Sequence, residues 1–237
     1  MNFYLSIALT EKTALLFFTR TSASEAAHKT FVHSKSTASN FLIASLFIKN
    51  ARTVATSSRL PVFEINEKQQ LGEGFGERLA NAIENVFAEG FENVIVIGND
   101  CPRLTNALLT SAADALKTQK VVLGPDQHGG VYLIGINKTF FNKDTFECSS
   151  WQTNHLFEDL VINFGNTETC VLPILKDVNQ FNDLLQLTNV LPKNSRIKAI
   201  VVSIIASSVK NYTYLADPYH NLLFHQSGLR APPLHFA

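Results

Sequence analysis

The sequence is poor in cysteine, and the three cysteines it has show no pairing pattern. Cys101, Cys148 and Cys170 are widely separated in a chain of 237 residues, and no CxxC motif occurs. An odd number of isolated thiols argues against a disulfide framework and favours a reducing compartment. We therefore expect a cytoplasmic protein.

Excess charge and long apolar segments are also lacking. The 20 lysines and arginines balance 20 aspartates and glutamates, so the formal net charge is zero and no nucleic-acid surface is predicted. The apolar run AIVVSIIASSV is too short to span a bilayer, which needs about 20 residues. The opening segment MNFYLSIALTEK has neither a basic n-region nor a cleavage site, so a signal peptide is not expected.

Short apolar runs alternate with helical patterns along most of the chain. Strands are predicted at residues 13–18, 61–65, 93–98, 120–124, 130–136 and 169–174. Helices are predicted after Ser22 or Ser24, over residues 39–54, around the apolar stripe at 79–87, from Thr105, and over 153–164. This alternation predicts an α/β domain with a mostly parallel sheet, covered on both faces, over residues 1–191. Residues 192–237 are interpreted as a C-terminal extension that packs on the core or on a partner subunit, which makes a homodimer possible.

The stretch VIVIGNDCPRL places a carboxylate directly after a buried strand. Gly98 allows close approach of the backbone, and Asn99 and Asp100 follow it. Ligands of open parallel sheets bind outside the carboxyl ends of the strands, so Asp100 is a candidate functional residue. The alternative is that Asp100 only braces the turn. Cys101 is interpreted as a small packing residue rather than a nucleophile, because a neighbouring carboxylate raises a thiol pKa.

A second strand ends in the same way. The segment VVLGPDQHGGVYLIG brings Asp126, His128, Gly129 and Gly130 between two predicted strands. The adjacent glycines suit either a backbone that approaches a ligand or a tight hairpin turn.

Three further positions are candidates with open alternatives. Arg78 lies in the first turn of a predicted helix, where positive charge is unfavourable, so it is expected to bind a phosphate or to contact Glu77 or Asp100. Trp151 either packs in the core or lines the acceptor side of a cavity, and Thr153 is a possible N-cap. The histidine spacing does not fit a zinc site.

The motifs GNDCPRL, LGPDQHGGVYLIGI, WQT and ILKDVNQFNDL together resemble the DUF2064 family of GT-A-fold, glycosyltransferase-like proteins (radical-SAM/selenodomain-associated transferase 1 group), over residues 13–188. The resemblance implies a three-layer α/β/α GT-A fold of the nucleotide-diphosphosugar transferase type. It also implies a divalent metal, Mg²⁺ or Mn²⁺, on Asp100, completed by Asp177 or Asn179. Asp177 and Asn179 could instead cap a helix that begins near Gln180.

The chain departs from the family pattern at three presumed phosphate and metal positions. The usual glycine-bearing basic loop after the first strand is replaced by FFTRTSASEAAHKTF, which keeps Arg20 and Lys29. His128 and Asn179 stand where the family has aspartates.

The resemblance as a whole implies a metal-dependent transferase acting on a nucleotide-activated sugar or a related diphosphate. In it, Asp100, Asp126 and His128 would act at the reacting centre, and the substrate would contact Arg20, Arg78, Gly98, Asn99, Gly129, Gly130 and Trp151. The alternatives are a non-catalytic nucleotide-binding module of the same fold and a nucleotidyltransferase.

Overall fold

The computed structural model describes residues 12–32 and 37–215, with side chains as far as residue 207. One six-stranded sheet has the strand order β2-β1-β3-β5-β4-β6. In chain order its strands are β1 (Thr13–Phe18), β2 (Val62–Ile65), β3 (Asn93–Ile97), β4 (Val121–Pro125), β5 (Val131–Asn137) and β6 (Thr169–Val171). Only β5 runs against its neighbours, because β4 and β5 form a hairpin, so the predicted mostly parallel sheet is confirmed.

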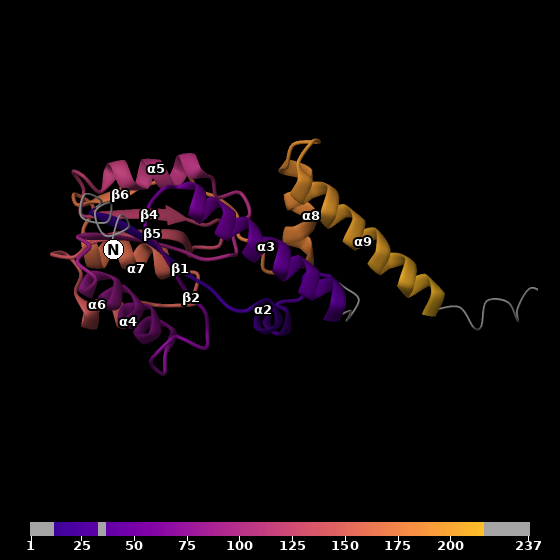
Figure 1. The fold of residues 1–237 in the computed structure, drawn as a ribbon, viewed down its shortest axis with the longest axis horizontal. Helices are drawn as coiled ribbons and strands as arrows, with labels where there is room; N and C mark the ends of the chain where they lie inside the picture. Colours follow the sequence, from indigo (N-terminus) through magenta and orange to yellow (C-terminus); the bar gives the residue numbers. More distant parts are fainter. Residues whose placement is uncertain (1–11, 33–36, 216–237) are drawn as a thin grey trace, which may run out of the picture.

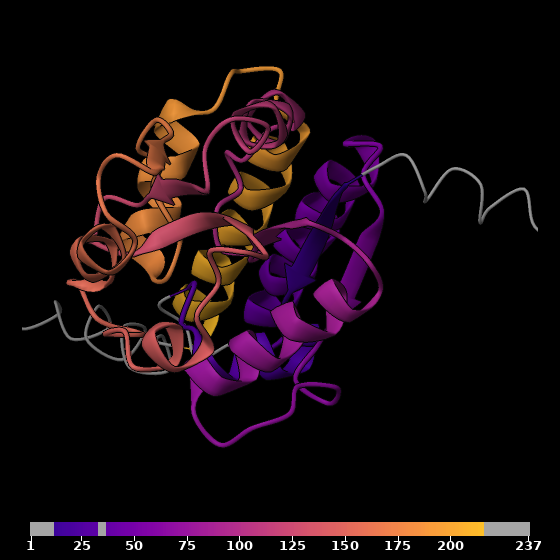
Figure 2. The same ribbon diagram turned by 90° about the vertical axis from the view of Figure 1, so that its left-hand side faces the viewer.

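The described helices cover both faces of this sheet or lie beside it. They are α2 (Ser22–His28), α3 (Thr37–Ser57), α4 (Phe75–Ala88), α5 (Asn106–Ala115), α6 (Lys143–Glu147), α7 (Leu156–Phe164), α8 (Phe181–Val190) and α9 (Arg196–Leu215). In Figure 1 and Figure 2, α5 lies above the sheet and α4 below it. The predicted three-layer α/β/α architecture is therefore confirmed.

Alternation along the strands explains why both faces are covered. Leu16 and Phe18 of β1 pack with the α4 and α7 side of the core, whereas Leu15 and Phe17 pack with the α3 and α5 side. Successive strand side chains point to opposite faces, so a strand that is apolar at every position needs a helical layer on each side.

The predicted α4 stripe is confirmed, since its apolar residues are all buried: Leu79, Ala82, Ile83, Val86 and Phe87. Gly90 follows the helix with φ +99°. Several boundaries differ from the predictions. The side chain of Thr21, not Ser22 or Ser24, caps α2 by accepting the Ser24 N–H. Helix α7 begins at Leu156 rather than at Thr153, and its N-cap is His155.

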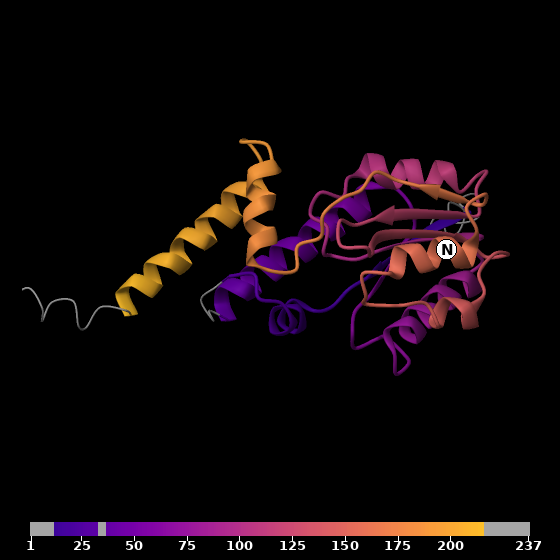
Figure 3. The same ribbon diagram turned by 180° about the vertical axis from the view of Figure 1, so that it is seen from behind.

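Helices α8 and α9 lie away from the sheet, beside α3 (Figure 1, Figure 3). Val201 of α9 and Leu184 of α8 are buried in one apolar cluster with Phe47 of α3. The described part of the predicted extension therefore packs on the chain's own helices, while residues 216–237 lie outside the described residues, as does the opening segment. No helix among the described residues is both long enough and apolar enough to cross a membrane.

Candidate functional site

Backbone hydrogen bonds join three loops at one edge of the sheet. The Val178 N–H donates to the Asp100 carbonyl at 2.8 Å, which joins the loop after β3 to the segment before α8. Gln127 N–H donates to Leu175 O at 3.0 Å, which joins the loop after β4 to the same segment. Residues 175–178 therefore hold the two predicted strand-end loops side by side.

A cavity of about 950 Å³ opens at this edge. Its walls come from the end of β1, α2, the start of α4, the ends of β3 to β5, and residues 151–156. The sequence-predicted residues that line it are Arg20, Arg78, Gly98, Asn99, Asp100, Asp126, His128, Gly130, Trp151 and Asn179. Tertiary structure thus brings together nearly all of the predicted site; Gly129 lies in the adjoining turn.

Asn99 holds the Asp100 carboxylate by a hydrogen bond from its side-chain amide. The Thr19 hydroxyl donates to Asn99 Oδ1 at 2.9 Å. The Asn99 amide nitrogen donates to Asp100 Oδ1 and to Glu25 Oε1, each at 3.1 Å. Because Asn99 is only 6% exposed and its amide is fully engaged, its role in this arrangement is to position Asp100 and Glu25.

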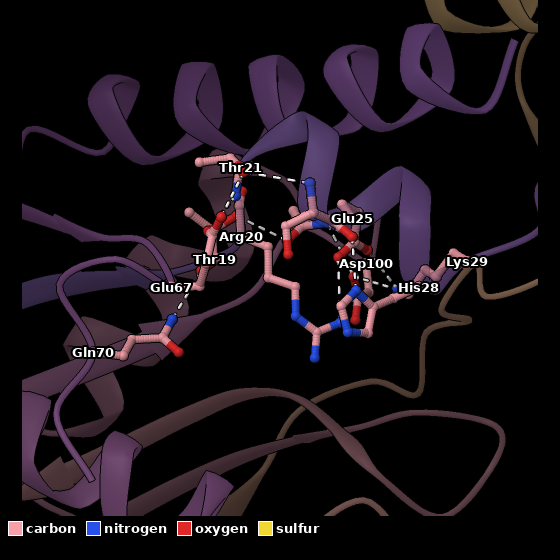
Figure 4. A network of polar contacts seen from close by, with 11 residues as sticks. Thr19, Arg20, Thr21, Glu25, His28, Lys29, Glu67, Gln70 and Asp100 are labelled. Atoms are coloured by element: carbon pink, nitrogen blue, oxygen red, sulfur yellow. Dashed lines mark hydrogen bonds and ion pairs between the residues drawn. The ribbon is translucent and has the colours of Figure 1, made fainter. Parts of the chain in front are cut away.

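Glu25 is a buried charge that the sequence analysis missed. It lies between two cations, with Lys29 Nζ at 3.0 Å and Arg20 Nη1 at 3.8 Å from its carboxylate oxygens (Figure 4). The spacing of Glu25 and Lys29, four residues apart in a short helical segment, was the available signal. The positive charge that the sequence retains after β1 is therefore partly neutralised inside the protein.

The loop after β1 is held by side chains from beyond β2. Glu67 accepts hydrogen bonds from the Thr21 N–H and the Thr21 hydroxyl, both at 2.6 Å. Gln70 donates to the Thr19 carbonyl at 2.9 Å (Figure 4). The Thr21 amide is thus already bonded within the protein and is not free to bind a phosphate.

Asp177 is the most perturbed acid of the site. It is 8% exposed, and its Oδ1 has no hydrogen-bond partner among the described residues. Burial, followed by the negative charges of Asp100 and Asp126, raises the pKa of Asp177 well above its usual range, and Lys29 offsets this only in part. The alternative of a helix cap is wrong for Asp177 and Asn179, because Gln180 is the N-cap of α8 and forms a capping box with Asp183.

The loop after β4 is a tight hairpin turn. Asp126 Oδ1 accepts hydrogen bonds from the backbone N–H groups of His128 and Gly130. Gly129 has φ +84°, and a Cβ there would lie 1.9 Å from the Asn154 carbonyl oxygen. The hairpin explanation of the two glycines is therefore confirmed.

Arg78 meets the cavity with part of its guanidinium unpaired. Its Nη1 donates to the Glu73 carbonyl at 2.7 Å, while its buried Nε has no partner among the described residues. Neither Glu77 nor Asp100, the two acidic neighbours expected from the sequence, is ion-paired with it in the described structure. Arg78 lines the cavity, and a guanidinium is suited to an anionic ligand.

Trp151 is held mainly by packing. Its indole N–H donates to the Phe146 carbonyl at 2.7 Å, and its ring lies 4.8 Å from that of Phe146 and 5.5 Å from that of Phe75. It also lines the cavity, so both of its predicted roles are compatible with its position.

Burial, together with the nearby Asp177, raises the pKa of the Cys101 thiol, which agrees with its interpretation as a packing residue.

The acidic residues of the site fit a divalent cation that is bound by few protein ligands. No cluster of three or more His, Cys, Asp or Glu side chains within residues 12–32 and 37–215 forms a ready metal cage. Mg²⁺, however, is commonly bound by one or two carboxylates plus water and substrate phosphates. The unpartnered Oδ1 of Asp177 and the electrostatic contact between Asp177 and Asp100 fit such a site.

Comparison with known proteins bears on the family resemblance and on the fold. Residues 39–153 match the family model described as "Uncharacterized protein conserved in bacteria (DUF2064)". No protein of curated function matches the chain. A crystal structure provisionally described as a nucleotide-diphospho-sugar transferase, from Desulfovibrio desulfuricans G20, matches with TM-score 0.71 and 20% identity, covering 85% of this chain and 98% of that one.

Two weaker structural similarities carry no argument of their own. Rv0371c from Mycobacterium tuberculosis H37Rv, in its complex with manganese, matches with TM-score 0.43 and 12% identity, over 76% of this chain and 98% of that one. A cytidylyltransferase from Leptospira borgpetersenii serovar Hardjo-bovis matches with TM-score 0.38 and 13% identity, over 89% and 100%. The resemblance expected from the motifs is confirmed, because the DUF2064 family model matches residues 39–153 and the chain has the fold of the Desulfovibrio desulfuricans structure.

Proposed function

We propose that the cavity binds a nucleotide-activated sugar or a related diphosphate and transfers its activated group to an acceptor. The observation that carries this proposal is the grouping of Asp100 and Asp126, with the buried Asp177 interacting electrostatically with both, in a cavity that Arg78 also lines. A cation-binding carboxylate group and an anion-binding guanidinium in one cavity are the two features that a metal-bound diphosphate requires.

Asp100 and Asp177 would hold the Mg²⁺ or Mn²⁺, and Asn179, which also lines the cavity, would complete the site. When bound, the metal would neutralise charge on the diphosphate. Arg78 and Arg20 would hold the phosphates, and Gly98 would let the backbone come close to the ligand.

The group transfer needs one proton acceptor. A hydroxyl oxygen of the acceptor would form a bond to the anomeric carbon, and the bond from this carbon to the diphosphate oxygen would break, so that the diphosphate leaves with the electron pair. His128 is exposed at the cavity edge, and an imidazole is a common general base. Asp126 is less available for this step, because its Oδ1 already accepts two backbone hydrogen bonds.

A second candidate is a non-catalytic nucleotide-binding module of the same fold. The pairing of Arg20 and Lys29 with Glu25 favours it, since this pairing lowers the positive charge available to phosphate. The nucleotidyltransferase alternative differs in the product: it releases pyrophosphate, whereas sugar transfer releases a nucleoside diphosphate.

The test is a thermal-shift panel of UDP-, GDP-, CDP- and dTDP-sugars and nucleoside triphosphates, with and without Mg²⁺ or Mn²⁺. A ligand at about 100 times its Kd adds roughly 2.7 kcal/mol, which corresponds to about 5–10 °C for a domain of this size. Asp100→Asn should abolish the shift, and Asp114→Asn, an exposed aspartate of α5, should keep it. If no nucleotide raises the melting temperature, or if Asp100→Asn responds like the wild type, the proposal is wrong.

A further inference from the structure

Lys29 is a buried cation whose ammonium lies on the carboxylate assigned to the metal. Its Nζ lies 2.6 Å from Asp100 Oδ1 and 3.0 Å from Glu25 Oε1 (Figure 4). Its side chain is only 13% exposed. The ammonium therefore contacts one of the oxygens that an incoming divalent cation would use.

The surroundings keep this lysine charged and in place. Two carboxylates, those of Asp100 and Glu25, lie within 3.0 Å of its Nζ, and opposite charges at this distance in a buried setting attract strongly. The Glu25 carboxylate is held in place beside Lys29, because it is buried and accepts a hydrogen bond from the Asn99 amide. Lys29 also follows α2 directly, and its backbone N–H donates to Glu25 O, so its stem starts from a fixed point.

We propose that the Lys29 ammonium is the resident counter-cation of Asp100, and that a divalent metal binds to Asp100 and Asp177 only by displacing it. This inference rests on the metal site of the proposed function. It adds that the free protein has low affinity for divalent cations, because Mg²⁺ or Mn²⁺ must compete with a tethered charge at 2.6 Å.

The acidic residues around Lys29 determine the direction in which the local charge changes when Lys29 is removed or displaced. With Lys29 present, its ammonium lies 2.6 Å from Asp100 and 3.0 Å from Glu25, and its charge also acts on Asp177. Without it, Arg20 is the other cation described within 4 Å of this acidic group, and it reaches only Glu25. Neutralising Lys29 should therefore leave excess negative charge at the place where a metal would bind.

The experiment measures Mn²⁺ binding to the full-length protein without nucleotide, by the loss of the free-Mn²⁺ paramagnetic resonance signal. Lys29→Gln should bind Mn²⁺ about tenfold or more tightly than the wild type. Lys143→Gln is the matched control, because it removes a lysine that lies 2.7 Å from Glu84 on α4, away from the cavity. This control should bind Mn²⁺ like the wild type.

Two further variants keep the result interpretable. Lys29→Met retains the aliphatic stem and should show the same gain if Lys29→Gln is poorly folded. Adding Asp177→Asn to Lys29→Gln should remove the gain, because the metal loses one of its carboxylates. Equal Mn²⁺ affinity in the wild type and both Lys29 variants, or a gain that survives Asp177→Asn, would overturn the inference. Either result would leave a positive nucleotide panel, and so the proposed nucleotide binding, intact, although the second would also remove Asp177 from the proposed metal site.

Discussion

The loop after β3 and the loop after β4 have similar sequences but opposite uses of glycine. A Cβ on Gly98 would meet no atom within 4 Å, and Gly98 lines the cavity. A Cβ on Gly129 would collide with the Asn154 carbonyl, and one on Gly130 would lie 2.5 Å from the Asp126 carboxylate. Gly98 is thus not required by the protein's own packing, whereas Gly129 is, because its Cβ would meet a backbone oxygen at positive φ.

The carboxylates of the two loops, Asp100 and Asp126, also differ in the groups that they bind. Asp100 bonds to side chains, Lys29 and Asn99, and its own side chain is 39% exposed. Asp126 accepts backbone N–H groups of its own turn. The loop after β3 therefore keeps its groups available to a ligand, while the loop after β4 uses them to hold its turn.

The largest expected effect is on the turn. Gly129→Ala should lower the stability by about 3 kcal/mol or more, because the new Cβ meets a backbone oxygen that cannot move aside. The melting temperature should fall by roughly 6–12 °C. Gly90→Ala is the matched control: Gly90 has φ +99° but nothing within 4 Å of its Cβ, so it should cost only about 1–2 kcal/mol. Equal losses in the two variants would show that the Asn154 contact is unimportant.

An intermediate effect is expected at Asp177, which faces both loops. The raised pKa means that the folded state holds a proton that the unfolded chain releases near pH 4, so stability is lost as the pH rises above that value. Asp177→Asn removes this loss and should stabilise the metal-free protein by about 1–3 kcal/mol at neutral pH, with little difference near pH 4.

The free energy of unfolding is measured by urea unfolding in EDTA at a series of pH values. Asp183 is the control, because its pKa is shifted in the opposite direction to that of Asp177. Hydrogen bonds from Lys176 and from the backbone of Asn179 lower the pKa of Asp183 despite its burial. Asp183→Asn should therefore destabilise the protein, most of all above pH 4. If Asp177→Asn also destabilises the protein at neutral pH, the interpretation of its pKa is wrong.

The smallest stability effect is expected at Gly98. Gly98→Ala should leave the stability unchanged or raise it by up to about 1 kcal/mol, since its Cβ has space. It should nevertheless weaken the thermal shift given by whichever nucleotide binds the wild type. Gly74→Ala, at a glycine with equally open space outside the cavity lining, should not alter that shift. Retained nucleotide binding in Gly98→Ala would remove Gly98 from the site.

Local patterns predicted the elements better than their ends. The α4 stripe and the fully apolar β1 and β3 runs were recognisable because periodicity depends only on neighbouring residues. Helix α6, with five residues, is too short to show a period, and its sequence gave no prediction. The start of α7 was misplaced because Thr153 resembles a cap in sequence, whereas its hydroxyl accepts the His155 N–H just before the helix.

The sequence by itself determined the sheet-forming runs, the helical stripes and the two loops that end in acidic and glycine residues, because these depend on periodicity and residue chemistry. Only the tertiary structure decided which of these groups face one another. The choice of Asp177 as the acid facing Asp100, the burial of Glu25 and the contact of Lys29 with Asp100 join residues up to 77 positions apart. Charge interactions over a few ångströms depend on distance in space, which one chain read in order does not contain.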